Sequence, residues 1–155
     1  MRTRETKIRY KILRPGAKAP TKTYDGDAGW DLYASLTGDA PAPVVVIQPG
    51  QVKAITTGLA LEIPKGWMGL IKERSGLASR YGVHVVGGVI DSGYRGELIV
   101  LLAKPHLPEE PLVVRDGDRI AQLLLLPVPE VEWLQADDLS PSERGTQGFG
   151  SSGRQ

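Results

Sequence analysis

The sequence predicts an all-β protein: a sandwich or barrel of short strands with one short helix and a flexible C-terminal tail. Its apolar residues recur with a period of two or in short continuous runs, and seldom with the 3.6-residue period of a helix. The 155 residues include 19 glycines and 12 prolines, which interrupt these runs at short intervals. Short strands separated by turn residues are typical of β-sandwiches and barrels. With 41% hydrophobic residues, the chain is apolar enough to form one core.

The first predicted strand is Ile8–Ile12, in which apolar and polar residues alternate. Eight further strands are predicted at Trp30–Ser35, Val44–Gln48, Val52–Thr56, Leu59–Ile63, Trp67–Lys72, Val83–Val86, Gly96–Ala103 and Arg119–Val128. Only Ser75–Arg80 indicates a helix, of one or two turns. We find no repeat of fixed period and no internal linker, and therefore expect one domain at residues 1–139 followed by a tail at residues 140–155.

The tail is too polar to form a core by itself, because Phe149 is its one large apolar residue. Gly148–Gly153 reads G-x-G-x-x-G, which marks a dinucleotide site when it connects a strand to a helix. Only two residues follow it, so we expect no helix there and reject that interpretation. Two hypotheses remain for the tail: a solvated linker, or a flap whose Arg144 and glycine-flanked N–H groups close over a polyphosphate.

Composition excludes several classes of function. The chain has no cysteine, which excludes a disulfide scaffold, thiolate-bound zinc and a cysteine nucleophile. Its two histidines are far apart in sequence, and there is no Walker A motif and no G-x-S-x-G elbow. A net charge of +1 argues against general nucleic-acid binding, and the apolar runs are too short to span a membrane. We expect a cytoplasmic protein with neither nucleic acid nor membrane as a partner.

Two polar clusters are candidates for chemistry. The segment Gly87–Glu97 predicts a β-hairpin in which Gly93 supplies a positive φ. Taken by themselves, Asp91 there is a turn aspartate and Tyr94 a half-buried strand aromatic. The second cluster, residues 74–76, is either an ordinary helix start with Ser75 as N-cap or an anion site made of an arginine, a hydroxyl and free N–H groups.

The order of the clusters resembles that of the five sequence motifs of the trimeric dUTPase family. The corresponding segments are Ala28–Ala34, Glu73–Ala78, Gly88–Glu97, Arg119–Leu123 and Arg144–Gly153. The resemblance implies a jelly-roll-like β fold and a homotrimer with three sites at subunit interfaces. It also implies Mg²⁺-dependent hydrolysis of dUTP to dUMP and pyrophosphate, which keeps uracil out of DNA and supplies dUMP for thymidylate synthesis. Under this resemblance the tail is an active-site flap.

Residue roles follow from the resemblance by motif. Asp91 is expected to be the general base that orients water for in-line attack on the α-phosphorus, since a carboxylate can accept the proton. Tyr94 is expected to pack under the deoxyribose and exclude a 2′-OH, while the main chain of Val85–Tyr94, including Gly88 and Val89, reads the uracil edge. Mg²⁺ would be chelated by substrate oxygens and water, with Asp31 acting on the ion's surroundings rather than binding it.

The remaining roles concern the phosphates and the base ring. Arg74, Ser75, Gly76 and Gln122 are expected to hold phosphates. In the tail, Arg144 resembles an arginine finger, Phe149 is expected to stack on uracil, and Gly150, Ser151 and Ser152 to cradle the terminal phosphate.

Three residues depart from the family pattern, and two other functions stay open. Val85 stands where many bacterial members have Asn, Glu73 where Pro is common, and Gln147 where Gly is usual.

The sister enzyme dCTP deaminase carries a glutamate a few residues after its own aromatic-x-Gly, but Leu98–Leu102 here is wholly apolar and cannot shuttle a proton. The third possibility is a non-catalytic nucleotide-binding jelly-roll module.

Overall fold

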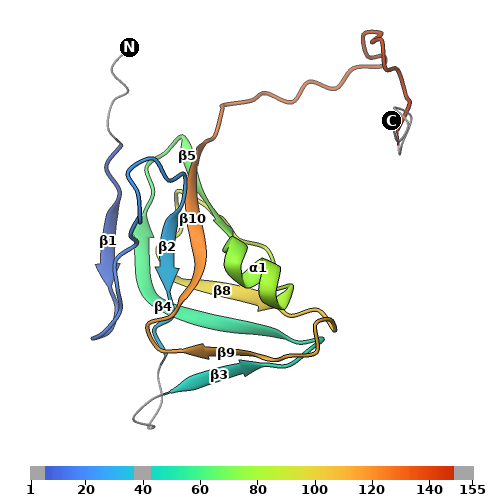
Figure 1. Cartoon of the computed structure of the whole chain (residues 1–155). Helices are drawn as coiled ribbons and strands as arrows, with labels where there is room; N and C mark the ends of the chain where they lie inside the picture. Colours follow the sequence, from blue (N-terminus) through green and yellow to red (C-terminus); the bar gives the residue numbers. More distant parts are fainter. Residues whose placement is uncertain (1–5, 37–42, 149–155) are drawn as a thin grey trace.

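The protein is built from two four-stranded antiparallel sheets, a separate two-stranded ribbon and one short helix (Figure 1). The structure is a computed structural model and describes residues 6–36 and 43–148. Its elements are β1 Arg9–Ile12, β2 Trp30–Tyr33, β3 Val44–Ile47, β4 Val52–Glu62, β5 Trp67–Lys72, α1 Ser75–Tyr81, β6 His84–Val85, β7 Val89–Ile90, β8 Glu97–Ala103, β9 Leu112–Arg115 and β10 Arg119–Pro127. The prediction of an all-β fold with one short helix is confirmed.

The two sheets enclose a single apolar core. One sheet has the strand order β1-β4-β8-β6 and the other β2-β10-β5-β7, while β3 pairs with β9. Strand β8 alternates in the way that a half-buried strand requires: Leu98, Val100 and Leu102 are fully buried, and Ile99 and Leu101 face outward. Leucines and isoleucines of β2, β5 and β10 face them from the other sheet, and those of β4 lie beside them in the same sheet.

Strand β4 is one long bent strand rather than the two strands that the sequence predicted. The predicted break fell between Thr56 and Leu59, and Gly58 there has a φ of 68°. This positive φ produces a bulge instead of a turn, and the β4–β8 register shifts between Thr56 and Ala60. Figure 1 shows β4 curving from the lower part of the body up alongside β1. The second half of β4 therefore pairs with β1 on its other edge.

The predicted hairpin around Asp91 is wrong, because the strands before and after it belong to different sheets. Strand β7 pairs with β5, whereas β8 pairs with β4 and β6. The chain crosses from one sheet to the other through the turn 91–94, which is closed by a 3.1 Å hydrogen bond from the Tyr94 N–H to the Asp91 carbonyl. The φ of Gly93 is not in the left-handed region; the positive values are at Gly87 and Gly88, 73° and 96°.

The chain leaves the body of the protein after β10. All residues from Leu126 to Gly148 are exposed, and Figure 1 shows this segment running away from the sheets. Its apolar side chains have almost no cover: Trp133 is 93% exposed and Leu139 90%. Strand β9 was not predicted, and β7 was predicted only as the first arm of the Asp91 hairpin, because each is short and lacks the alternation that marks a longer strand.

Candidate active site

Residues from three separate segments meet in a polar cavity of about 320 Å³, the Arg74 cavity. Its lining consists of Thr23, Tyr24, Asp27, Ala28, Gly29, Asp31, Arg74, Ser75, Gly76 and Gln122. Five of these were selected from the sequence as candidates: Asp31, Arg74, Ser75, Gly76 and Gln122. They come from β2, the start of α1 and β10, which neighbour one another because β10 pairs with both β2 and β5.

The arginine of this cavity is held in place by Asp31. Its Nε donates to Asp31 Oδ1 at 2.9 Å, and Arg119 Nη1 donates to Asp31 Oδ2 at 3.1 Å. The Asp31 side chain is only 14% exposed, so both charge-assisted bonds are partly shielded from water. Sequence reasoning missed Arg119, although it opens one of the segments that resemble family motifs. The result is a carboxylate that orients two guanidinium groups at one wall.

Gln122 and Gly29 shape the opposite part of the cavity. The Gln122 side-chain amide donates to the Glu73 carbonyl at 2.9 Å, which fixes the amide at the end of β5. A Cβ added to Gly29 would stand 3.1 Å from the Cβ of Gln122, closer than ordinary van der Waals contact. Glycine at position 29 therefore leaves room for the Gln122 side chain.

Helix α1 begins at this cavity without a side-chain cap. Ser75 is its first helical residue and Arg74 is its N-cap, so the hypothesis of Ser75 as N-cap is wrong. Arg74 has extended backbone angles, φ −84° and ψ 136°, and its carbonyl accepts the first helical hydrogen bond, from Ala78. Among the described residues, no side chain accepts from the first N–H groups of this helix, so they are available to an acceptor in the cavity.

Two of the three family departures contact each other. The Glu73 carboxylate accepts a hydrogen bond from the Val85 N–H at 3.3 Å and forms a 3.2 Å ion pair with Lys72. The pKa of Glu73 is lowered, chiefly because its own backbone N–H donates to the carboxylate, with the Val85 N–H and Lys72 adding to the effect. The negative charge of Glu73 is thus directed toward β6, and Glu73 does not line the Arg74 cavity.

A second, smaller cavity of about 160 Å³ contains the candidate base and is called the Asp91 cavity. Its lining is Val89, Ile90, Asp91, Tyr94, Glu97 and Ile99. Among the described residues, the Asp91 side chain has no hydrogen-bond or ion-pair partner, and Asp91 is exposed. Gly88, also a candidate, lies close to β5: a Cβ there would stand 2.6 Å from the Ile71 carbonyl oxygen, and the Ile71 N–H donates to Gly88. Packing against β5 therefore requires glycine at this position.

The two cavities share no lining residue within the described part of the chain. The tail does not join them, because Arg144 is exposed and its Nε donates to the carbonyl of Gln147, within the tail. The candidates Phe149, Gly150, Ser151 and Ser152 lie outside the described residues. One folded chain thus presents the candidate residues as three separate groups.

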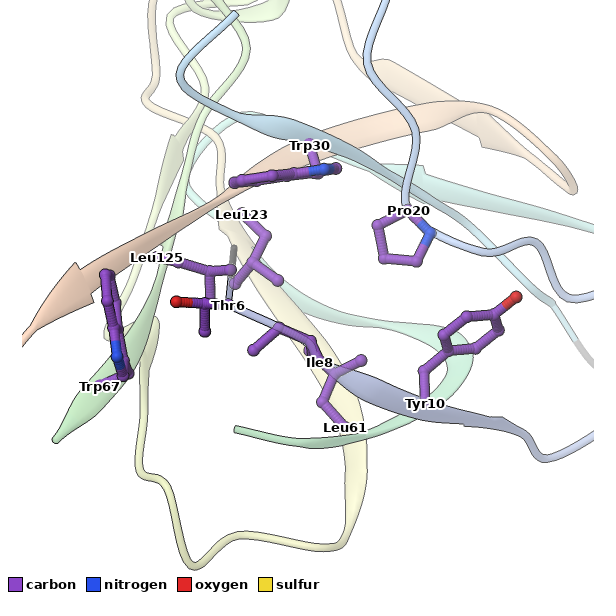
Figure 2. A pocket seen from close by; sticks show the side chains of 9 residues that line it. All are labelled: Thr6, Ile8, Tyr10, Pro20, Trp30, Leu61, Trp67, Leu123 and Leu125. Carbon is purple, nitrogen blue, oxygen red and sulfur yellow. The ribbon is translucent and has the colours of Figure 1, made fainter. Parts of the chain in front are cut away.

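A third cavity, of about 480 Å³, lies apart from all the candidate residues and is apolar (Figure 2). Trp30 and Trp67 stand at its edges, with Ile8 and Leu123 between them. Its lining has no charged side chain, so it offers no cationic partner to a phosphate group.

Comparison with known proteins identifies the family. The family model described as dUTPase matches residues 16–153, nearly the whole chain. The chain belongs to the dUTPase family. A deoxyuridine 5′-triphosphate nucleotidohydrolase from Gloeobacter violaceus is 48% identical over 136 residues, covering 86% of this chain and 88% of that protein. The enzyme of the same name from Mycobacterium marinum is 47% identical over 148 residues, covering 91% of each chain.

Solved dUTPase structures share the fold. The Staphylococcus bacteriophage 80alpha dUTPase with dUPNHPP is 30% identical, with a TM-score of 0.82 over 96% of this chain and 99% of that chain. The predicted jelly-roll-like architecture is therefore confirmed by a member of the same family. A variant dUTPase from phage phi11 of S. aureus, described with a structural Mg(II) ion, has the same fold at 24% identity and a TM-score of 0.73.

Neither a protein-only metal cluster nor a membrane helix occurs in the described part of the dUTPase-family chain. Residues 6–36 and 43–148 contain no group of three His, Cys, Asp or Glu side chains placed to hold a metal ion. Within the same residues, no helix has the length and apolar character needed to cross a membrane. Strand β8 has no carboxylate between Leu98 and Leu102, and so offers no proton shuttle of the deaminase type.

Proposed function

We propose that this protein hydrolyses dUTP to dUMP and pyrophosphate. The observation that carries the proposal is the Arg74 cavity, in which five candidate residues from three segments that resemble dUTPase family motifs line one polar space. An arginine, a hydroxyl, a side-chain amide and uncapped helix N–H groups all donate hydrogen bonds, as a polyphosphate requires. The 80alpha relative, with dUPNHPP bound, supports a deoxyuridine nucleotide as the ligand.

The phosphate chain is held by Arg74, Ser75, Gly76 and Gln122. Arg74 binds best if its guanidinium is oriented before the substrate arrives, because a fixed donor loses less entropy on binding. Asp31 provides that orientation through its 2.9 Å bond to Arg74 Nε, leaving the two terminal nitrogens of the guanidinium for phosphate oxygens. Catalysis of phosphoryl transfer depends mainly on such positioning and on electrostatic stabilisation.

Asp91 is the general base. Its carboxylate is exposed and has no hydrogen-bond partner among the described residues, so it is free to accept a proton from a water aimed at the α-phosphorus. Tyr94 lines the same cavity and serves as the wall against which the deoxyribose packs. The main chain at Gly88 and Val89 reads the uracil edge, and Val85 contributes no side-chain amide to that reading.

Mg²⁺ suits this site as a partner of the substrate. The ion usually keeps several waters and binds through substrate phosphates with one or two carboxylates. Asp27 and Asp31 line the Arg74 cavity and are the carboxylates that could face the hydrated ion. When bound, Mg²⁺ neutralises negative charge on the phosphate oxygens.

The active site is shared between copies in a homotrimer. Within the described part of one chain, the Arg74 cavity and the Asp91 cavity have no common lining residue, which supports a site that a second copy completes by bringing phosphate donors to the base. The exposed apolar side chains of the segment between β10 and the tail support assembly, since exposed apolar patches often mark contact surfaces. Val131, Trp133 and Leu134 are each more than half exposed.

The tail closes over the bound substrate. Arg144 acts as an arginine finger on the phosphates, and Phe149 with Gly150, Ser151 and Ser152 covers the base and the terminal phosphate. In a cytoplasmic setting, this reaction keeps uracil out of DNA and supplies dUMP for thymidylate synthesis.

Incubation of the pure protein with Mg²⁺ and either dUTP or dCTP, following pyrophosphate and ammonia together, tests the proposal. Pyrophosphate without ammonia is the expected result. Ammonia release from dCTP would instead place the protein with the deaminases, and the absence of both products would leave a nucleotide-binding module. A parallel assay with EDTA tests the requirement for Mg²⁺, and sedimentation tests the trimer.

A further inference from the structure

An ion pair connects the N-terminal segment to the Asp91 cavity. Arg14 donates through both terminal nitrogens to the two carboxylate oxygens of Glu97, each at 2.7 Å. The side chains are only 23% and 20% exposed, and 83 positions of sequence separate the two residues. Bidentate arginine–carboxylate pairs are the most directional ion pairs in proteins. The pKa of Glu97 is lowered, chiefly by this hydrogen bonding from Arg14.

The bulge of β4 is shaped to receive this pair. The Gly58 N–H donates to Glu97 Oε1 at 2.7 Å, so one carboxylate accepts three hydrogen bonds. A Cβ on Gly58 would stand 3.0 Å from Arg14 Nη1 and 2.5 Å from the Cβ of Ala17. Only glycine both adopts the φ of 68° without strain and leaves space for the guanidinium.

Glu97 in turn holds the ring of Tyr94. The Tyr94 hydroxyl donates to the Glu97 backbone carbonyl at 3.0 Å. The ring lies against Gly96, where an added Cβ would stand 2.6 Å from the Cζ atom of Tyr94. Glu97 also lines the Asp91 cavity together with Asp91 and Tyr94. The position of the Tyr94 ring thus depends on where the first residue of β8 is fixed.

We propose that Arg14 is a positioning residue that, through Glu97, sets the location of the Tyr94 ring and thereby the preference for a deoxyribonucleotide over a ribonucleotide. This inference rests on the proposed function, in which Tyr94 packs against the sugar. Excluding one hydroxyl group by contact needs a wall that does not yield. Tyr94 is 44% exposed, so burial alone does not immobilise it.

Loss of Arg14 acts on Glu97 first. A partly buried carboxylate without its partner is costly, and the strand end relaxes toward water to solvate it. The carbonyl that accepts the Tyr94 hydroxyl moves with that strand end. The ring then tolerates a 2′-OH more readily, so the kcat/KM for UTP rises relative to that for dUTP.

The test compares the ratio of kcat/KM for dUTP and UTP in wild type and Arg14→Gln. We expect the ratio to narrow by about 3- to 30-fold, the usual range for coupled neighbours. Arg9→Gln is the matched control: it breaks another arginine–glutamate pair, to Glu62 at 2.5 Å, on the exposed edge of β1. The control should leave the ratio unchanged. A lowered melting temperature with an unchanged ratio in Arg14→Gln would reduce the pair to a structural role and overturn the inference.

A double-mutant cycle makes the test independent of stability. Tyr94→Phe keeps the ring but removes the hydroxyl that reaches Glu97, so Arg14→Gln should narrow the ratio much less in that background than in wild type. Equal, additive effects in both backgrounds would contradict the proposal. If Arg14→Gln does not fold, Glu97→Gln takes its place, because the amide oxygen still accepts from the Gly58 N–H. Wild-type protein that fails to hydrolyse dUTP would instead refute the proposed function itself, a result distinguishable from an unchanged ratio.

Discussion

Arg74 and Asp91, the central charged residues of the two cavities, differ in how their side chains are held. In the Arg74 cavity, Asp31 bonds both Arg74 and Arg119, and Gln122 is tied to the backbone of Glu73. In the Asp91 cavity, the Asp91 carboxylate has no side-chain or backbone partner among the described residues. Binding groups are therefore prearranged by bonds within the chain, whereas the base is positioned by the backbone turn alone.

This difference reflects two requirements. A group that binds phosphate gains from being held rigidly before the ligand arrives. A general base must exchange a proton, and every hydrogen bond to its charged form would lower its pKa and weaken it as a base. Substitutions in the two cavities should consequently separate effects on stability from effects on turnover.

The largest effect is expected from the tail, whose described residues line neither cavity. Truncation after Pro141 should lower dUTP turnover by about 10³–10⁵-fold, the range known for an arginine supplied to a phosphoryl transition state. The melting temperature should barely change, because the described part of the tail is exposed. Arg144→Lys is the control for charge, since lysine keeps the positive charge of the side chain but lacks the planar guanidinium group. Full turnover in the truncated protein would make the tail a linker.

Asp91→Asn is expected to have the next largest effect. Hydrolysis should fall by about 10²–10⁴-fold, because the amide keeps the size of the side chain but cannot accept a proton. Binding of a non-hydrolysable dUTP analogue with Mg²⁺, measured by calorimetry, should persist. The melting temperature should stay within error of wild type, since Asp91 is exposed and unbonded within the described residues. Near-normal turnover would show that another group is the base.

Asp31→Asn, in contrast to Asp91→Asn, should lower stability and weaken binding of the analogue. Here two arginines lose their shared carboxylate, and the free energy of unfolding should fall by about 1–3 kcal/mol, as for other hydrogen bonds to charged groups. Affinity for the analogue should weaken by about tenfold, since Arg74 is no longer held in one orientation. Chemical denaturation and calorimetry give both values. A variant with wild-type stability and reduced turnover alone would break the contrast between the two cavities.

The smallest effect is a pH dependence of stability at Glu97. Arg14 holds the pKa of Glu97 below its ordinary value, so the Glu97 carboxylate binds a proton less readily in the folded state than in the unfolded state. The resulting stability is present above the unfolded pKa of about 4.3 and is lost as pH falls through the lower folded value. The difference in melting temperature between wild type and Glu97→Gln should therefore be constant near neutral pH and shrink below about pH 4. A constant difference down to pH 2 would contradict this assignment.

Much of the fold could be predicted from local pattern. Runs such as Trp67–Lys72 and Gly96–Ala103 became strands with nearly the predicted bounds, because their apolar residues are bounded by Gly or Pro. The failures involve tertiary partners. Gly58 was read as a break between strands, yet its positive φ is accommodated in a bulge that pairing on both edges of β4 stabilises. The separate sheet membership of β7 and β8 likewise has no local signal.

The residues of the candidate site were predicted from their motifs, but the ion pairs that hold the site were not. Residues such as Asp31, Arg74 and Gln122 were selected by resemblance and lie together in one cavity. Arg119, which pairs with Asp31, and Arg14, which pairs with Glu97, were missed. Nothing in the sequence distinguishes these two arginines from ordinary surface cations. Ion pairs across 83 or 88 positions depend on the fold, and no window along the chain contains both members.

The turn that carries Asp91 is one of the connections between the two sheets. Ile90 on one side of it packs against the same core into which Leu98, on the other side, is fully buried. The position of the Asp91 carboxylate therefore depends on the distance between the two sheets. Repacking the core with side chains of slightly different volume would shift Asp91 by fractions of an ångström without touching any residue of either cavity. Turnover in this protein is thus adjustable from its interior, by substitutions that inspection of the active site alone would classify as neutral.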